Sequence, residues 1–466
     1  MSTFASAPTS SDLKQLAFDV VAKARKAGAT DAEAVVYEGE EFGALVRLGQ
    51  VEQLKESGSR AVGLRVFIGQ RTASTSSSDF SSESIERLVS GAVTLAKITS
   101  EDPFAGLPET EAFGQIEGDP VHGLGLYFED VNEMPPAERI EIARRTEAAA
   151  MAYDTRITNS GGGDFDTATS HKILVNSRGF VGEYRKSYCG FSASPIAQGE
   201  TGGMQRNYWY SNSRTTRLLE SPEAIGQEAA RRTLKRLGAR QVKTQAAPVV
   251  FSPEIAKSIM GNIFEAANGD AIYRHATFFA DMLGERVAGE NITVVDDGTM
   301  VFEGIGGFGT SPFDGEGLPT RRKVIVERGI LKNYVMNTYT ARKLGMASTG
   351  NASRGLAGNP GIGAGNFYLE AGTLTPEEII ADVKNGLYVT ETMGFGVNLV
   401  TGDYSQGASG MWIENGEIAY PVEEITIAGN LKDMYKNVVA IGNDLVFRGA
   451  SAAPTIRVEG MMIAGA

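Results

Sequence analysis

The sequence predicts an α+β protein: an N-terminal domain of antiparallel sheet and helices, followed by a β-rich C-terminal domain with a barrel-like or sandwich-like core. The chain has 466 residues, which exceeds the size at which one hydrophobic core keeps growing. Its first half alternates helices with groups of strands, whereas its second half consists mainly of strand-like runs separated by glycine-containing turns. We therefore expect two domains, residues 1–240 and residues 241–466.

The first predicted element is a helix from about Ser11 to Ala27, where apolar residues recur at helical spacing and Gly28 marks the end. Four strand-like runs follow, and their division by glycine and serine predicts short antiparallel hairpins. A second helix comes next, with Ser82 as its N-cap and one apolar face. The four strand-like runs are AEAVVYEG, ALVRLG, VEQLKES and RAVGLRVFIG.

The rest of the N-terminal domain repeats the pattern of helix, strands and helix. Residues 101–120 are rich in proline, glycine and acid, and we expect a surface connection there. A helix over residues 136–153 leads to strands over residues 156–212, in which GGGD at residues 161–164 is predicted to be a turn. A helix over residues 222–237, with proline in its first turn, closes the domain, and QVKTQAAP forms the linker.

The C-terminal domain contains one helix with strong local signals, TPEEIIADVKNG. Thr375 is its predicted N-cap, Pro376 takes the first helical position, and Glu378 completes a capping box. Gly386 is the predicted end of this helix. The remaining runs, such as NITVVDDG, RKVIVERG and TIRVEGMMIAG, predict strands of a barrel or sandwich.

Composition excludes two classes of partner. The net charge is −13, and the chain has no long basic run, so the sequence predicts no binding to nucleic acid or to an anionic membrane. The segment MSTFASAPTSSD has neither the basic region nor the apolar region of a secretory signal. No run reaches 18 apolar residues. We therefore expect a soluble, cytoplasmic protein.

Few side chains are available for thiol or imidazole chemistry. Cys189 is the only cysteine, which excludes an intrachain disulfide and a cysteine-rich metal cluster. The only histidines are His122, His171 and His275. Because Cys189 lies in the strand-like run GEYRKSYCGFSAS, we expect a small buried thiol rather than a nucleophile.

Two polar clusters in the C-terminal domain are candidate binding residues. In SPFDGEG, Asp314 and Glu316 are one residue apart, so extended backbone would aim both carboxylates from one face. In TGDYSQGASG, Asp403, Tyr404 and Ser405 lie together between two strand-like runs, among small residues that let another backbone come close. We expect these five residues to line the cleft that receives substrate, without performing catalysis. The alternative is two unrelated surface turns.

Three long segments of the sequence carry a family resemblance: RLGQVEQLKESGSRAVGLRVFIGQRTASTSSSDFS, SPFDGEGLPTRRKVIVERGILKNYVMNTYTARKLGMASTGNASR and GDYSQGASGMWIENGEIAYPVEEITIAGNLKDMYKNVVAIGNDL. They resemble the TldD/PmbA family, in the order that family members have them. The resemblance implies a two-domain α+β fold in a cytoplasmic heterodimeric metallopeptidase that degrades unfolded or small peptides and matures ribosomally made peptides.

Within that family, the TldD-type subunit carries an HExxxH zinc helix and a further cysteine ligand near its C-terminus. At the corresponding place, Met260–Glu265, this chain has MGNIFE, and its C-terminal segment has no cysteine. The resemblance therefore implies the TldE/PmbA-type subunit, with no catalytic residue, metal ligand or cofactor of its own. We expect the helix to be kept as a scaffold, with Ile263 and Phe264 as packing residues.

The implied partner is a TldD-type HExxxH subunit that holds the zinc, with unfolded or small peptides as substrates. Two alternatives are left open. The first is a stand-alone peptidase with a metal held by Asp314, Glu316 and Asp403, whose oxygen ligands suit Mg²⁺ or Ca²⁺ better than zinc. The second is a homodimeric peptide-binding or chaperone-like module without chemistry.

Overall fold

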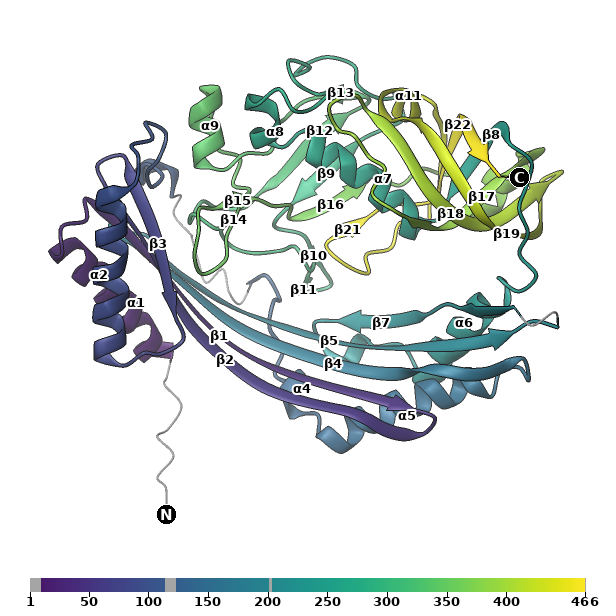
Figure 1. Cartoon of the computed structure of the whole chain (residues 1–466), viewed down its shortest axis with the longest axis horizontal. Coiled ribbons are helices and arrows are strands. Elements are labelled where there is room, and N and C mark those ends of the chain that lie inside the picture. The colour runs from purple at the N-terminus through teal and green to yellow at the C-terminus, as the bar shows by residue number, and fades with distance from the viewer. Residues whose placement is uncertain (1–9, 114–122, 201–202, 466) are drawn as a thin grey trace.

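The structure is a computed structural model that describes residues 10–113, 123–200 and 203–465. A long curved antiparallel sheet dominates the N-terminal half, and the β-rich C-terminal half lies over one face of that sheet (Figure 1). Helices cover the opposite face of the sheet (Figure 1). This architecture confirms the predicted α+β class.

The long sheet has seven strands in the order β3-β2-β1-β4-β5-β6, with β7 also paired to β5. Every pair in it is antiparallel. The strands are β1 (Asp31–Arg47), β2 (Gln50–Ile68), β3 (Arg71–Ser77), β4 (Ile157–Asn176), β5 (Val181–Gln198), β6 (Met204–Arg206) and β7 (Trp209–Ser213).

Two groups of helices pack on the same face of this sheet. Ile173 and Phe165 on β4 are separated by an even number of residues, so both side chains leave the strand on one side. Ile173 joins the core under α1 and α2, and Phe165 joins the core under α5 and α6. The helices and 3₁₀ turns of this half are α1 (Ser10–Lys26), α2 (Ser82–Ile98), η1 (Thr110–Ala112), α4 (Asp130–Glu133), α5 (Pro136–Met151), η2 (Thr216–Leu218) and α6 (Pro222–Leu234).

The strands are longer than the sequence predicted. The four expected runs are two continuous strands, β1 and β2, which pair along their whole length with a bulge near Leu45. GGGD at residues 161–164 is not a turn but part of β4, where the register with β5 shifts between Ser160 and Gly163. Glycine in these strands forms bulges and close contacts instead of ending them. The N-cap of α2 is Ser81, not Ser82, because the Ser81 hydroxyl accepts the Ser84 backbone N–H.

The C-terminal half contains a closed barrel. Five strands pair in a ring, β8-β17-β18-β19-β22, because β19 pairs with β22 and β22 with β8, and β20 is added beside β22. Closure leaves the ring without an unpaired edge, as predicted for a barrel-like domain. Its strands are β8 (Gln245–Phe251), β17 (Asn385–Met393), β18 (Asp403–Glu414), β19 (Glu417–Asn430), β20 (Val438–Ile441) and β22 (Ile456–Ala464).

A second sheet, in the order β13-β12-β9-β16-β21, lies beside the barrel, with α7 in contact with both (Figure 1). The predicted capping box at Thr375 is confirmed, but Gly386 lies inside β17 and does not end α10. The remaining elements of this half are α7 (Pro253–Ala266), α8 (Gly269–Tyr273), β9 (Val294–Asp297), β10 (Val301–Phe302), β11 (Ile305–Gly306), β12 (Arg322–Glu327), β13 (Ile330–Leu331), α9 (Thr338–Leu344), β14 (Ala352–Ser353), β15 (Gly361–Ile362), β16 (Asn366–Leu369), α10 (Pro376–Ala381), α11 (Leu431–Lys436) and β21 (Ser451–Ala452).

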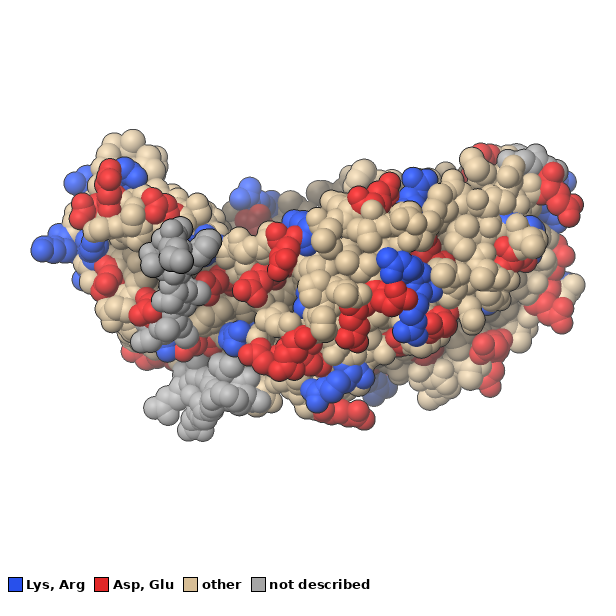
Figure 2. Space-filling model, turned by 90° about the horizontal axis from the view of Figure 1, so that it is seen from below, with Lys and Arg blue, Asp and Glu red and all other residues tan. Residues whose placement is uncertain are grey.

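The long sheet is built from residues 31–213, and the barrel begins at Gln245. We therefore propose residues 1–240 and 241–466 as the two domains. On the face seen from below the sheet, acidic and basic side chains are interspersed, without a basic patch among the residues drawn in colour (Figure 2). None of the described helices has the length and apolarity needed to cross a membrane.

The capping box at the start of α10 allows the contribution of a predicted N-cap to stability to be measured. The Thr375 hydroxyl accepts the Glu378 backbone N–H at 3.2 Å, and the Glu378 carboxylate accepts the Thr375 N–H at 2.8 Å. We expect Thr375→Ala to lower the free energy of unfolding by about 1 kcal/mol, because it removes an N-cap acceptor. Urea unfolding of the variant measures this loss, and Thr373→Ala, two residues upstream, is the matched control. Equal stability of the two variants would contradict the assignment.

Candidate functional site

The two halves meet at a group of buried charges, which we call the interface ion cluster: Glu33, Arg65, Glu316 and Arg354. Glu33 on β1 and Arg65 on β2 are cross-strand neighbours, and Arg65 Nε lies 2.5 Å from Glu33 Oε1. Arg354, from the C-terminal half, places Nη1 2.5 Å from the same oxygen. Arg65 Nη2 lies 4.0 Å from Glu316 Oε1. None of the four side chains is more than 5% exposed.

The pKa of Glu33 shows which effect prevails in the cluster. Burial alone would raise its pKa, but the charges of Arg354 and Arg65 outweigh burial, and the pKa is lowered. Glu33 is therefore ionised at neutral pH and attracts Arg354 of the C-terminal half to the sheet. Close backbone contact accompanies it: a Cβ at Gly63 would lie 1.6 Å from the Leu356 carbonyl oxygen, so only glycine fits there.

Asp314 lies in a tight turn rather than in extended backbone. Its Oδ1 accepts the backbone N–H groups of Glu316 at 2.8 Å and Leu318 at 3.0 Å, and its Oδ2 accepts that of Ala352 at 2.9 Å. Burial raises the pKa of this carboxyl, and the neighbouring Glu316 raises it further. The carboxylate therefore organises the loops that carry Arg354 to the interface.

Glu316 points to a different neighbour. One of its oxygens accepts the Thr338 N–H at 2.8 Å, at the start of α9. Burial raises the pKa of Glu316, and Arg65 opposes this shift. Asp314 and Glu316 are thus close in space, yet each is engaged by a separate set of backbone donors.

Asp403, Tyr404 and Ser405 lie at the start of β18, away from that cluster. The Asp403 carboxylate is exposed and accepts the Thr401 hydroxyl at 2.6 Å and Asn430 Nδ2 at 3.2 Å, which lower its pKa. Tyr404 is only 4% exposed and belongs to the hydrophobic core of the C-terminal half. Ser405 is exposed, and its N–H is bonded to the Gly396 carbonyl at 2.6 Å.

Two cavities border the interface ion cluster. The interface pocket, about 490 Å³, is lined by Arg65 and Glu316 together with aromatic side chains such as Phe104 and Tyr339. The Lys172 pocket, about 150 Å³, is lined by Asp314 and Arg354. Neither includes residues 403–405, so the structure does not bring the two predicted clusters together in these cavities. The other residues that line the Lys172 pocket are Lys172, Tyr184, Phe313, Gly315, Ala352, Ser353, Gly363 and Ala364.

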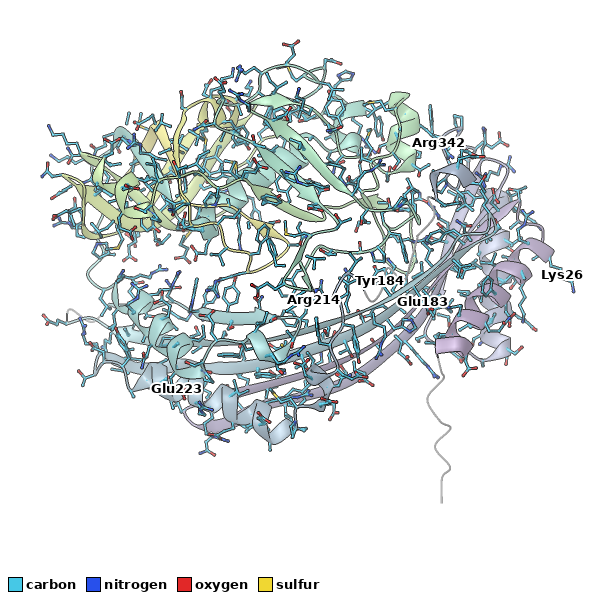
Figure 3. The ribbon with its side chains drawn as sticks, turned by 180° about the vertical axis from the view of Figure 1, so that it is seen from behind. Lys26, Glu183, Tyr184, Arg214, Glu223 and Arg342 are labelled. Carbon is cyan, nitrogen blue, oxygen red and sulfur yellow. The ribbon has the colours of Figure 1, made fainter. Side chains whose placement is uncertain are left out.

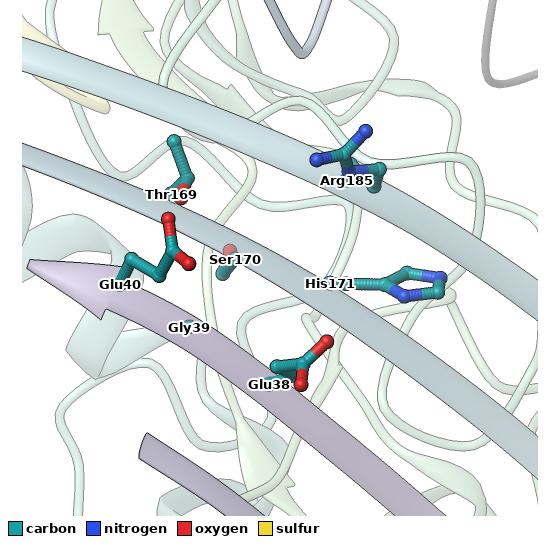
Figure 4. Close-up of a pocket in the computed structure, with 7 residues that line it drawn as sticks. All are labelled: Glu38, Gly39, Glu40, Thr169, Ser170, His171 and Arg185. Carbon is teal, nitrogen blue, oxygen red and sulfur yellow. The ribbon is translucent and has the colours of Figure 1, made fainter. Parts of the chain in front are cut away.

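A third cavity lies on the outer, helix-bearing side of the long sheet, where Glu38, Glu40, His171 and Arg185 project from β1, β4 and β5 (Figure 4). It encloses about 290 Å³. The His171 ring nitrogen Nε2 lies 3.2 Å from Glu183 Oε2, and Glu183 also pairs with Lys14 of α1.

Helix α7 packs its apolar face into the core, and the positions that correspond to the two zinc-binding histidines are Met260 and Glu265. Met260 is 1% exposed, and Phe264 packs edge-to-face on Phe367 with ring centroids 5.5 Å apart. Ile263 is fully buried, so the predicted packing role of these residues is confirmed. Glu265 faces outward. These side chains do not fit a zinc ion, and the described residues contain no group of three or more His, Cys, Asp or Glu side chains placed to hold a metal.

Sequence reasoning missed the cations at the interface. Arg354 lies at the end of the GNASR segment, and Lys172 lies in a strand-like run. The only available signal was a charged residue between apolar neighbours in a strand, as for Glu33 in AEAVVYEG. Cys189 is buried as predicted, and burial raises the pKa of its thiol to about 12.

Comparison with known proteins identifies the family. Profiles of the PmbA/TldA metallopeptidase domain 1, central domain and C-terminal domain match residues 32–96, 129–237 and 244–465. Metalloprotease PmbA of Escherichia coli O157:H7 is 39% identical over 421 residues, which cover 90% of this chain and 89% of that protein. The chain belongs to the PmbA/TldD metallopeptidase family.

Other relatives of the PmbA/TldD family agree over the whole length. A metalloprotease PmbA homolog of Haemophilus influenzae is 35% identical over 459 residues, covering 97% of this chain and 96% of the relative. A protein of Bacteroides thetaiotaomicron proposed to modulate DNA gyrase matches with a TM-score of 0.90 and 26% identity, covering 98% of this chain and all of the other. TldE from Thermococcus kodakarensis shares the fold, with a TM-score of 0.84 and 22% identity, covering 97% of this chain and 100% of that one.

Glu33 provides the sharpest test of the interface ion cluster. We expect Glu33→Gln to lower the free energy of unfolding at pH 7 by about 3–5 kcal/mol, because it leaves Arg65 and Arg354 buried without a counter-charge. The folded-state pKa of Glu33 is lowered, so its stabilisation is present above pH 4.5 and is lost as the pH falls through the folded-state value. The gap between wild type and variant should therefore narrow below pH 4.5.

Urea unfolding at several pH values measures both the loss of stability in Glu33→Gln at pH 7 and its decrease below pH 4.5. Glu40→Gln, an exposed position on the same strand, is the matched control and should change stability by less than about 0.5 kcal/mol. Two results would mean that Glu33 does not hold the interface. One is a difference in the free energy of unfolding between wild type and Glu33→Gln that does not change with pH. The other is a Glu33→Gln variant as stable as Glu40→Gln.

Proposed function

We propose that this chain is the non-catalytic, TldE/PmbA-type subunit of a heterodimeric metallopeptidase. One observation carries the proposal: in a metallopeptidase family, the two histidine positions of the zinc helix fall in this chain on Met260, which is buried in the core, and on Glu265, so α7 offers no imidazole to a metal. A peptidase that contains this chain must then take its zinc from another subunit.

The partner of this proposal is a TldD-type chain with the HExxxH helix, which holds the zinc and its activated water. Support comes from the relatives named metalloprotease PmbA and from the shared fold of the protein named TldE. This chain would enclose the proteolytic chamber. We propose a cytoplasmic location for the pair, with no nucleic-acid or membrane partner.

The proposed substrates are unfolded or small peptides, including ribosomally made peptides that the pair would mature. A chamber shared by two subunits limits access to extended chains, and such chains can be held by strand addition to an exposed sheet edge. We further propose that Asp314, Glu316, Asp403, Tyr404 and Ser405 shape the surroundings of the substrate without taking part in catalysis.

The two alternatives find less support in the geometry. A stand-alone peptidase would need Asp314, Glu316 and Asp403 to converge on one ion. Asp314 and Glu316 are occupied by backbone N–H donors, and Asp403 is bonded to Thr401 and Asn430 at the start of β18. No observation favours a homodimeric chaperone-like module.

Mixing experiments test the proposed function directly. We expect this chain alone to hydrolyse no unfolded peptide, and a mixture with the HExxxH homologue from the same genome to form a stable heteromer that does. Size-exclusion chromatography and cleavage of a fluorogenic peptide measure assembly and activity. Full activity of the HExxxH subunit alone would contradict the proposal, as would cleavage by this chain alone.

The role of the β18 residues needs variants that keep the core intact. Tyr404→Ala would open a cavity, so the informative change is Asp403→Ala with Ser405→Ala, both on exposed side chains. We expect heteromer assembly to persist and peptide turnover to fall severalfold. Thr373→Ala is the control for an exposed position. Unchanged turnover would remove these residues from the site, and loss of assembly would place them at the subunit interface.

A further inference from the structure

The Lys172 pocket combines a small polar cavity with buried positive charge. It lies between the inner face of the long sheet and the loops of the C-terminal half, with Lys172 on β4 and Tyr184 on β5 as cross-strand neighbours. Tyr184 projects into the space between the sheet and the C-terminal half (Figure 3). The opposite wall comes from Asp314, Ser353 and Arg354.

The cations around this pocket have fewer partners than their burial requires. The Arg354 side chain is 1% exposed, and its Nε and Nη2 have no hydrogen-bond partner among the described residues. Only Nη1 is paired, with Glu33. Lys172 is held by no hydrogen bond or close ion pair with any described side chain, and burial lowers its pKa to about 8, with Arg354 adding to the shift. Arg354 is buried and Lys172 is half-buried, and cations with so few counter-charges are costly, so these two groups favour an anion between them.

The negative charges nearby do not cancel this excess. Glu33 is ionised but shared by Arg65 and Arg354. The Asp314 carboxylate borders the pocket, yet both its oxygens accept backbone N–H groups, and its raised pKa brings it toward the neutral form. On the next strand, burial lowers the pKa of Lys186 to about 7, and Arg214 and Lys172 contribute to that shift. The local field is therefore positive.

We propose that the Lys172 pocket binds a small oxyanion, a carboxylate or a phosphate, through the Lys172 ammonium, with Arg354 supplying a second positive charge from the wall.

The size and chemistry of the cavity agree with this ligand class. A volume of about 150 Å³ corresponds to roughly five water molecules, at about 30 Å³ each, which is the space of one phosphate or one terminal carboxylate group. The hydroxyls of Tyr184 and Ser353 stand among the lining residues as additional donors. Phe313 packs edge-to-face on Tyr184 at 5.2 Å and closes the pocket on its apolar side.

Two sources could supply the oxyanion: free phosphate, or the terminal carboxylate of a peptide in the space between the halves. Binding can be measured on this chain without a partner subunit. The inference therefore stands or fails independently of the proposed heterodimer.

Calorimetric titration of the full chain at pH 7 distinguishes the sources. The probes are inorganic phosphate, N-acetyl-diglycine with its free carboxylate, and the C-terminal amide of the same peptide. Binding of phosphate alone assigns free phosphate as the ligand, and binding of the acid but not the amide assigns the peptide terminus. If neither anion binds, or if the amide binds as well as the acid, the proposal is wrong.

Lys172→Met separates a binding role from a structural one. We expect the variant to lose at least about tenfold in affinity for the anion that binds, since it lacks the ammonium donor. Without ligand it should melt at a higher temperature than wild type, because an unpaired, half-buried charge is gone. The control is Lys55→Met, which removes an exposed lysine paired with Glu41 and should leave affinity unchanged. Unchanged affinity in Lys172→Met would overturn the proposal.

A pH series on the unmodified chain keeps the test independent of whether the variant folds. Sulfate is the probe, since its charge is constant from pH 6 to pH 9.5. The titratable or charged groups around Lys172 are Asp314, Arg354, Tyr184 and Glu33, together with Tyr37 opposite it on β1 and Lys186 on β5. Affinity should begin to fall from about pH 7, where Lys186 and Asp314 lose protons, and should fall further past about pH 8, where Lys172 loses its proton. A flat profile would contradict the assignment.

Discussion

The buried carboxylate of Glu33 joins the two halves of the molecule, because its two arginine partners come from opposite sides of the interface. Arg65 lies on the neighbouring strand of the long sheet, and Arg354 lies on a loop of the C-terminal half. The loop reaches this position because Asp314 ties it down and Gly63 admits the backbone of Leu356. Members of the interface ion cluster line both cavities between sheet and barrel, and further contacts, such as that of Arg214 with the Gly306 carbonyl, hold the two halves together.

Local signals in the sequence predicted most of the elements and the fold class. The capping box at Thr375 and the apolar stripe of α1 were sufficient to predict the start of α10 and the buried face of α1. Both features depend only on residues that are close in the sequence. Strand length was misjudged at Gly39 and Gly43, which lie inside β1. A glycine ends a strand or bends it according to what packs against it, and that information is not local.

The candidate site was harder to predict for the same reason. Asp314 and Glu316 were found because they are adjacent in sequence, but their roles follow from backbone donors at Ala352 and Thr338. The pairing of Glu33 with Arg354 and the position of Lys172 beside Asp314 join distant parts of the chain. Only the folded structure reveals that several cations converge on one small cavity.

The central claim is that this chain contributes no zinc ligand to the peptidase in which it acts. The most direct measurement is metal analysis of the purified heteromer and of each subunit alone, after brief dialysis against a weak chelator. We predict one zinc per heteromer, retained by the HExxxH subunit alone and lost when a histidine of its motif is replaced, and no stoichiometric zinc in this chain. One tightly bound zinc in this chain by itself would contradict it.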